Sequence, residues 1–173
     1  KTQLEQEPNR IVELLNQSLE NIQPIVTAIS AKAAVFHNHT LLVEQTVKQL
    51  ADALELSPEN REMLRLAALL HDIGMVIVPD AVLGKQSALT AEDWTLIRNH
   101  SATGAGFLEK VPALRHLAPI VRHHHERYDG GGYPDGLRGE AIPYLARILT
   151  VADTHASMVA EWVGHKARSP AEA

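Results

Sequence analysis

The chain has no cysteine, which excludes disulfides, thiolate nucleophiles and zinc sites built on cysteine. No stretch approaches the roughly 20 consecutive apolar residues of a membrane span, and no basic segment followed by an apolar run indicates a secretion signal. We therefore expect no integral membrane segment. Basic residues are in the minority, because 16 Lys and Arg stand against 21 Asp and Glu and give a net charge of −5. A chain with this balance is not expected to bind long nucleic acids.

Histidine is the residue in excess, with ten copies among 173 residues. Aromatic side chains are few: two Trp, two Phe and three Tyr. Apolar residues make up 45% and charged residues 21% of the chain, which is ordinary for a folded domain. The length suits one domain with a sizeable core rather than two.

Helical periodicity runs through most of the chain. Ser57 and Pro58 supply an N-cap and a first-turn proline for a helix that continues to Leu70 and is apolar around most of its circumference. The one candidate strand is 76–78. The sequence predicts an all-α fold, a single helical bundle. Other helices are expected over these ranges: 9–22, 25–36, 40–54, 91–98, 101–110, 113–125 and 143–160.

The chain divides at about residue 36. Residues 1–36 are either a helical connector from an upstream domain or extra helices of the bundle, and residues 37–173 form the main domain. If they are a connector, these first helices also offer a route to a homodimer. The sequence leaves both interpretations open.

His71 and Asp72 stand together at the end of the most hydrophobic helix. A charge in such a place is costly unless it is paired or bound to a metal ion. The pair is therefore either a hydrogen-bonded helix end or part of a metal site, and the dipeptide alone does not decide between them.

Three consecutive histidines, 123–125, form a second candidate site. His124 continues the helical stripe of Leu114, Leu117 and Val121, so we expect it to face the core. Two adjacent neutral imidazoles at a helix end can reach one metal ion. The alternative is a partly exposed polar helix end.

Asp153 is the third candidate, at the edge of an apolar stripe that includes Leu149 and Ala152. A carboxylate there needs a cation, and no Lys or Arg falls within the predicted core. His39 and His100 each stand near a predicted helix start. Taken singly, a histidine is more often a satisfied polar residue than a ligand, so neither is nominated on its own.

Together these residues form an ordered pattern. His39, His71-Asp72 and Asp153 resemble the His…His-Asp…Asp order of the HD superfamily of metal-dependent phosphohydrolases. The runs His124-His125-Glu126, Asp129-Gly130 and Gly132-Tyr133-Pro134 resemble the extended signature of its HD-GYP subfamily. The motifs keep the family's order from about residue 39 to residue 153.

The resemblance implies an HD-type helical bundle and a bacterial cyclic di-GMP phosphodiesterase. Such domains yield a linear dinucleotide, GMP or both, and act as cytoplasmic output modules behind a sensor or receiver domain. Cyclic di-GMP, or another cyclic dinucleotide, would be the substrate. The alternative is an HD-GYP module that binds metal and a cyclic dinucleotide or protein partner without efficient turnover.

The resemblance also implies two divalent transition metal ions, Fe or Mn before Zn or Ni. Asp72 would bridge them as the catalytic residue, because two ions about 3.5–4 Å apart can clamp a phosphoryl group together. Residues 132–134 would contact the substrate. In some relatives a third ion is held by a Glu at the position of Val35, so we expect two ions here. The implied ligands of the first ion are His39, His71, Asp72 and Asp153, and those of the second are His100, His124 and His125, besides Asp72.

Several positions depart from the family pattern. Met75 stands where a Lys is usual, and Ala156 replaces an Asp. Residues 161–165 replace a stretch that carries two Arg, and the usual final helices are missing. We therefore expect normal metal loading with weak hydrolysis of cyclic di-GMP.

Glycines crowd the segment 130–139, which holds five of the ten in the chain. We expect a tight loop that forms a mobile lip at the cavity, because it starts only a few residues after His125. The alternative is an ordinary surface loop without contact to the site.

Overall fold

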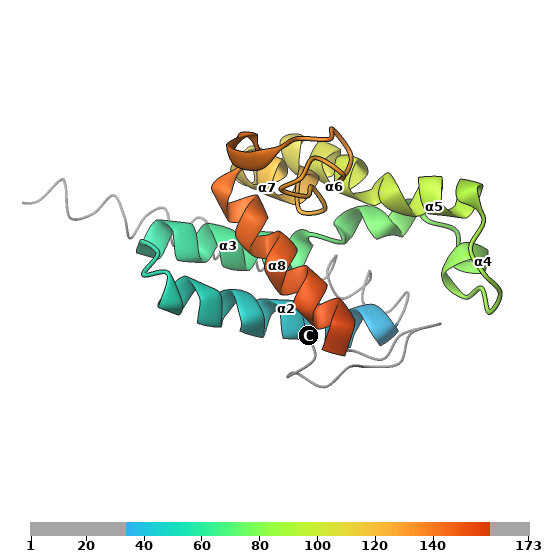
Figure 1. The fold of residues 1–173 in the computed structure, drawn as a ribbon, viewed down its shortest axis with the longest axis horizontal. Coiled ribbons are helices and arrows are strands. Elements are labelled where there is room, and N and C mark those ends of the chain that lie inside the picture. Colours follow the sequence, from blue (N-terminus) through green and yellow to red (C-terminus); the bar gives the residue numbers. More distant parts are fainter. Residues whose placement is uncertain (1–33, 160–173) are drawn as a thin grey trace, which may run out of the picture.

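The computed structural model describes residues 34–159, which fold as a bundle of helices (Figure 1). The predicted all-α fold is confirmed, and no strand occurs within these residues. The N-terminal connector and the altered segment 161–165 lie outside them. The helices are α2 (Ala34–Ala53), α3 (Pro58–Leu70), α4 (Asp80–Leu83), α5 (Ala91–Arg98), α6 (His100–Glu109), α7 (Ala118–Arg122) and α8 (Tyr144–Val159), with 3-10 turns η1 (Ile73–Ile77), η2 (Arg115–Leu117) and η3 (Gly139–Ala141).

Helices α2, α3 and α8 form one side of the bundle (Figure 1). A short turn joins α2 to α3, and α8 packs against both of them. Helices α6 and α7 pack together on the other side, and α4 and α5 extend away from the bundle. Leu64, Leu66 and Leu149 are among the fully buried residues of the core between these helices.

The two predicted helix caps, at Ser57 and Thr90, are confirmed. The Ser57 hydroxyl accepts a hydrogen bond from the Asn60 amide at 3.3 Å, and Pro58 occupies the first turn of α3. Thr90 and Asp93 form a reciprocal capping box at the start of α5, with bonds of 3.2 and 2.8 Å. Each side chain satisfies a backbone amide that the first turn leaves without a partner. Helix α2 begins at Ala34, one turn before the predicted domain boundary, and that boundary stays a prediction.

The strand predicted over 76–78 is wrong, because this segment belongs to η1 and the residue after it. The Met75 amide donates to the Asp72 carbonyl at 2.8 Å, and the Val78 amide donates to the Met75 carbonyl at 3.0 Å. The segment carries β-branched residues, but Gly74 lies against α6 and closes the chain into a tight turn. Tertiary packing here outweighs the intrinsic preference for a strand.

The helix predicted over 113–125 is divided into η2 and α7, with Pro119 in the first turn of α7. The predicted inward face is nevertheless confirmed: Leu114, Leu117, Val121 and His124 are all buried. The short helix α4 was not predicted from the sequence.

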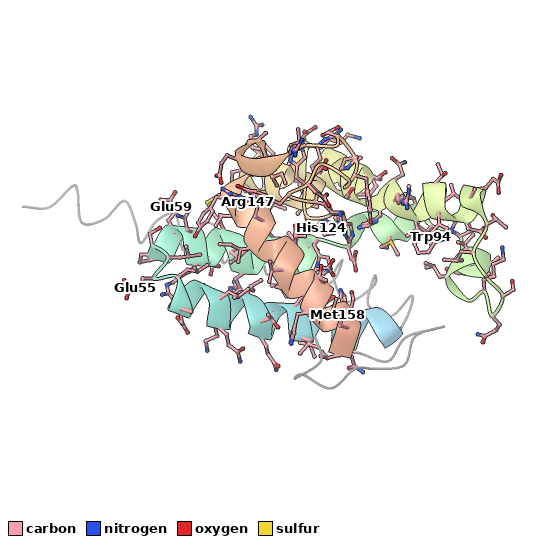
Figure 2. The ribbon with its side chains drawn as sticks, in the orientation of Figure 1. Glu55, Glu59, Trp94, His124, Arg147 and Met158 are labelled. Carbon is pink, nitrogen blue, oxygen red and sulfur yellow. The ribbon has the colours of Figure 1, made fainter. Side chains whose placement is uncertain are left out.

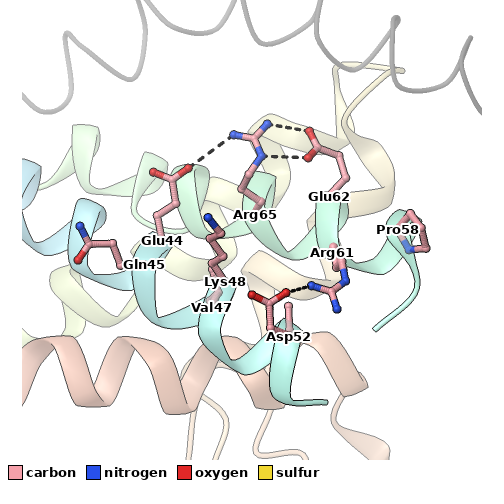
Figure 3. Close-up of a pocket in the computed structure, with 10 residues that line it drawn as sticks. Glu44, Gln45, Val47, Lys48, Asp52, Pro58, Arg61, Glu62 and Arg65 are labelled. Atoms are coloured by element: carbon pink, nitrogen blue, oxygen red, sulfur yellow. Dashed lines mark hydrogen bonds and ion pairs between the residues drawn. The ribbon is translucent and has the colours of Figure 1, made fainter. Parts of the chain in front are cut away.

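A hollow of about 460 Å³ lies between α2 and α3 (Figure 3). Arg65 lies between Glu44 and Glu62 at its rim, and Arg61 pairs with Asp52. Its lining contains none of the seven predicted metal ligands. Among the helices of residues 34–159, none combines the length and the hydropathy needed to cross a membrane.

Candidate metal centre

The seven predicted ligands converge from five parts of the chain. α2 supplies His39, the end of α3 leads into His71 and Asp72, α6 begins with His100, and α8 supplies Asp153. His124 and His125 directly follow α7. Neighbouring imidazole rings lie 4.0–5.5 Å apart between centroids, from His39 through His71 and His124 to His100 and His125. Figure 2 marks the position of the cluster at His124, which is fully buried.

The ligand atoms form two groups that could each hold a metal ion. Group one contains His39, His71 and Asp153, and group two contains His100, His124 and His125. Within each group the candidate ligand atoms lie within 4.8 Å of one another. The division agrees with the two sets that the resemblance implies.

Asp72 lies between the two groups. Its Oδ2 is 3.2 Å from His71 Nε2, and its Oδ1 is 3.3 Å from His100 Nε2. One carboxylate oxygen therefore faces each group, which is the arrangement that a bridging ligand requires.

Asp153 also faces both groups. Its Oδ1 is 2.9 Å from His39 Nε2 and 3.9 Å from His71 Nε2, and its Oδ2 is 3.6 Å from His125 Nδ1. The two carboxylates thus supply the negative charge in a cluster otherwise made of imidazoles.

Backbone carbonyls orient three of the imidazoles. Nδ1 of His71 contacts the Ala68 carbonyl at 2.7 Å, and Nδ1 of His100 and of His124 contact the carbonyls three residues earlier at 2.6 Å. A carbonyl oxygen only accepts, so each Nδ1 carries a proton, and in the neutral form of each ring Nε2 presents its lone pair. A second hydrogen bond of this kind is the usual way in which proteins orient a metal-binding histidine.

The surroundings of His71 Nε2 indicate a metal ligand independently of the sequence motif. It is buried and forms no hydrogen bond within residues 34–159, and the nearest carboxylate oxygen is Oδ2 of Asp72 at 3.2 Å. A buried polar atom without a partner is costly, and a bound cation would remove that cost. The donor set of imidazoles and carboxylates also suits divalent transition metals.

The protonation states of the cluster residues suit metal binding. Burial works against the charged form of His71, but the carboxylates of Asp72 and Asp153 outweigh it and raise its pKa to about 9. The same carboxylates would attract a metal cation in place of that proton. Burial and the neighbouring imidazoles lower the pKa of His125 to about 3 and that of His124 well below its usual value, so both rings are neutral at neutral pH.

The two acidic residues stay charged at neutral pH. Burial opposes the charge on Asp72, yet the imidazoles of His71 and His100 hold the pKa of this carboxyl well below its usual value. Burial likewise opposes the charge on Asp153, and a hydrogen bond from His39 helps to lower its pKa.

The glycine-rich loop lies against the cluster, as predicted. The Tyr133 ring stacks on His125 with 4.8 Å between centroids and 29° between planes, and the Tyr133 amide donates to the His125 carbonyl at 3.2 Å. Gly132 is required by space, since a Cβ atom there would lie 2.3 Å from the Arg127 nitrogen. These contacts place Tyr133 at the candidate site, but none of them tests the predicted contacts of 132–134 with a substrate.

Glu126 holds this loop in place, a role that the sequence did not reveal. Its carboxylate is buried and accepts hydrogen bonds from the amides of Asp135 at 2.7 Å and Leu137 at 3.1 Å. The Asp135 side chain also pairs with Arg122 and His123, which precede the loop. The predicted mobility of the loop stays a prediction, and these bonds weigh against it.

The two described positions that depart from the family pattern are apolar and covered. Met75 is buried in η1, and Ala156 is buried in α8. Neither supplies a charge to the site. His123, the first of the three consecutive histidines, lies outside the cluster and pairs with Asp135 at 2.9 Å.

Comparison with known proteins connects this site to a family. A family model described as "HD domain" matches residues 13–173. The 3'3'-cGAMP-specific phosphodiesterase 2 of Vibrio cholerae is 32% identical over 149 residues, which is 84% of this chain and 28% of that protein. The cyclic di-GMP phosphodiesterase response regulator RpfG of Xanthomonas campestris is 44% identical over 106 residues, which is 60% of this chain and again 28% of that protein.

A solved structure has the same fold. Bd1817, a HDG"Y"P protein from Bdellovibrio bacteriovorus, superposes with a TM-score of 0.64 at 25% identity, over 84% of this chain and 49% of that chain. The chain thus spans less than a third of the two curated relatives and about half of this structural one.

Proposed function

We propose that this chain, which belongs to the HD domain family and within it to the HD-GYP proteins, is the catalytic module of a metal-dependent phosphodiesterase. It would hydrolyse cyclic di-GMP to the linear dinucleotide, to GMP or to both. Because one relative is a 3'3'-cGAMP-specific phosphodiesterase, the substrate class is that of the cyclic dinucleotides.

The observation that carries the proposal is the position of Asp72. One of its oxygens faces each of two groups of ligand atoms, at 3.2 Å and 3.3 Å from the nearest imidazole nitrogens. A protein that binds a single structural ion has no use for a second group joined to the first by a shared carboxylate.

Each group would hold one divalent ion, with Asp72 shared between them. His39, His71 and Asp153 would hold the first, and the three imidazoles of group two the second. When bound, two such ions supply Lewis acidity to the phosphoryl oxygens and make a water molecule nucleophilic at neutral pH.

The protein groups would prepare the site for this chemistry. The Nδ1–H bonds of His71, His100 and His124 keep their Nε2 atoms pointed at the ions without further reorientation. Tyr133 would cover one side of the site and exclude water there. Burial and the carboxylates of Asp153 and Asp72 raise the pKa of Tyr133, so its hydroxyl stays protonated and available as a donor.

A single preparation tests the proposal. The protein is purified without chelators, loaded with Mn or Fe, analysed for metal per chain, and incubated with cyclic di-GMP and with 3'3'-cGAMP. We expect two ions per chain and a linear dinucleotide or GMP as product. His116→Ala, at an exposed histidine outside the cluster, serves as the control and should behave like the unmodified protein. One ion or none after metal addition, together with unchanged substrates, would contradict the proposal.

A second candidate is a module that binds a cyclic dinucleotide without efficient turnover. It is favoured by the buried, apolar Met75 and Ala156, which leave the site without charges that the family pattern places there. In the same experiment this candidate predicts bound but unchanged substrate. The proposal has further parts. The resident metal would be Fe or Mn, and the protein would act in the cytoplasm. A sensor or receiver domain would precede this chain, and the N-terminal helices would form a dimer.

A further inference from the structure

Arg98 is exposed at the C-terminal end of α5, two residues before His100. Its guanidinium carbon lies over the Tyr133 ring at 5.6 Å from the centroid, and Tyr133 is the ring that stacks on His125. A single aromatic ring therefore separates this cation from a ligand of group two.

Two aromatic rings lie near the Arg98 guanidinium. One turn earlier on α5, the Trp94 ring lies 5.9 Å from the same carbon atom (Figure 2 marks Trp94). Cation–π contacts of this kind favour a position of the guanidinium near the ring faces and leave its N–H groups available as donors. Trp94 is 42% exposed, so part of its surface remains open beside the site.

Arg98 lacks the carboxylate partner that most other arginines have. Within residues 34–159, no Asp or Glu pairs with it, whereas five other arginines of that range each form an ion pair: Arg61, Arg65, Arg122, Arg127 and Arg147. An oriented cation without an anion, at the edge of a site for phosphodiesters, is suited to bind a phosphate.

The position also answers a deficit in the site. Met75 is buried and apolar where the family pattern has a Lys, so this position supplies no cation that could neutralise a phosphate. A cyclic dinucleotide carries two phosphates, and a centre that holds the reacting one leaves the other in need of a cation.

We propose that Arg98, next to the rings of Trp94 and Tyr133, binds a phosphate of the substrate beside the metal centre. The assignment rests on the proposed function for the nature of the substrate, but it concerns phosphate binding and is testable by binding alone. Lysine would keep the charge at this position and lose the planar, stacked donor pair.

The test compares three variants of the metal-loaded protein: Arg98→Ala, Arg98→Lys and the control Arg115→Ala, which removes an exposed arginine from η2. Equilibrium binding of cyclic di-GMP, 3'3'-cGAMP, GMP and inorganic phosphate is measured by calorimetry, with metal content per chain as the check on the site. We expect Arg98→Ala to weaken binding of the cyclic dinucleotides about 10- to 100-fold at unchanged metal content. The affinity of Arg98→Lys for the cyclic dinucleotides should lie between those of Arg98→Ala and the unmodified protein. The affinity of Arg115→Ala should equal that of the unmodified protein.

The outcomes separate this proposal from the proposed function. If the unmodified protein binds GMP or phosphate but no cyclic dinucleotide, the proposed substrate is wrong, and weaker phosphate binding in Arg98→Ala still supports the role of Arg98. If Arg98→Ala binds every probe as tightly as the unmodified protein, or loses no more than Arg115→Ala, the role of Arg98 is wrong whatever the substrate. If the unmodified protein binds none of the four probes, both proposals are wrong.

Discussion

The two groups of ligand atoms differ in charge. Group one contains its own carboxylate, Asp153, whose Oδ1 is 2.9 Å from His39 Nε2. Group two consists of three imidazoles, and its nearest negative charge is Asp72, with Oδ1 3.3 Å from His100 Nε2. An ion in group two would therefore depend mainly on the shared Asp72, with Asp153 Oδ2 3.6 Å from His125 Nδ1, whereas an ion in group one would have Asp153 among its own ligands.

The groups also differ in how they are held. Among the contacts described for residues 34–159, Nδ1–H bonds to backbone carbonyls occur at His100 and His124 in group two and at His71 in group one. Group two is thus better oriented and less charged. The comparison teaches that preorganisation and charge are divided unequally between the two sites and that Asp72 joins them.

Replacing Asp72 should have the largest effect. Asp72→Ala removes the carboxylate that faces both groups, so we expect loss of both ions, or of all hydrolysis if one ion stays in group one. Metal analysis and product analysis on the same samples give the answer. Asp52→Ala, at an exposed carboxylate paired with Arg61, should change neither quantity. Two ions and normal turnover in Asp72→Ala would show that the groups are independent.

Single-group variants sharpen the comparison. Asp153→Ala removes the carboxylate of group one, and His100→Ala removes one of three imidazoles in group two. We expect each variant to bind one ion instead of two at saturating metal. The retained ion should be released at a higher pH from Asp153→Ala than from His100→Ala, because it then lies in the group without its own carboxylate. Metal content per chain, measured as the pH is lowered from 8, gives the pH at which each variant releases its ion. Release from His100→Ala at the higher pH would contradict the prediction.

Glycine 74 controls the distance between the groups. A Cβ atom at Gly74 would lie 1.9 Å from the His100 carbonyl oxygen and 2.7 Å from the Gly104 nitrogen, so Gly74→Ala must push η1 away from α6. Overpacking of this kind costs about 1–3 kcal/mol in the free energy of unfolding. The same shift separates Asp72 from His100, and we expect weaker metal binding in group two.

Gly106→Ala is the matched control for this substitution. It lies in the same helix α6, and nothing stands within 4 Å of its added Cβ atom. Here alanine should raise the free energy of unfolding by about 0.5–1 kcal/mol, because glycine is the poorer helix former. Urea unfolding of both variants measures the difference. Equal effects would show that the contact of η1 with α6 is not tight.

Local rules predicted only part of this site, and the full set of ligands came from the ordered motifs that resemble the HD-GYP pattern. His124 was placed in the core by a helical stripe with Leu117 and Val121, and the structure buries all three. The helix starts at Ser57 and Thr90 followed from side-chain chemistry that acts over three residues.

The remaining features depend on segments that are distant in sequence. The short turn at η1 is set by its packing on α6, so the β-branched run there predicted a strand that does not form. The stacking of Arg98 on Tyr133 joins α5 to a loop more than thirty residues later, and no periodicity reports such a contact. Glu126 was noticed only as part of a motif, since its partners are backbone amides nine and eleven residues later.

Glu126 tests the loop separately from the metals. Glu126→Gln keeps the size of the side chain but places an amide NH₂ against one of the two backbone N–H groups that the carboxylate now satisfies. A buried donor without a partner costs about 1–3 kcal/mol. We expect looser seating of Tyr133 and about 10-fold weaker use of the cyclic dinucleotide at two ions per chain. Glu109→Gln, at an exposed residue of α6, is the control, and a loss of metal in Glu126→Gln would show that the loop also supports the ligands.

The smallest expected effect lies at the outer side of the same loop, where Asp135 pairs with Arg122 through bonds of 2.6 and 2.7 Å. The hydrogen bond from Arg122, with help from His123, lowers the pKa of Asp135 to about 2. A lowered pKa means that the folded state favours the charged form, so the stabilisation is complete above the ordinary pKa of 3.8 and is lost as the pH falls towards 2. An exposed pair is worth about 0–1 kcal/mol. The difference in urea midpoint between the unmodified protein and Asp135→Asn should be small and constant from pH 7 to 5 and shrink from pH 4 downward. A difference that grows in acid would mean that the pair does not stabilise the fold, and that the loop is held by Glu126 alone.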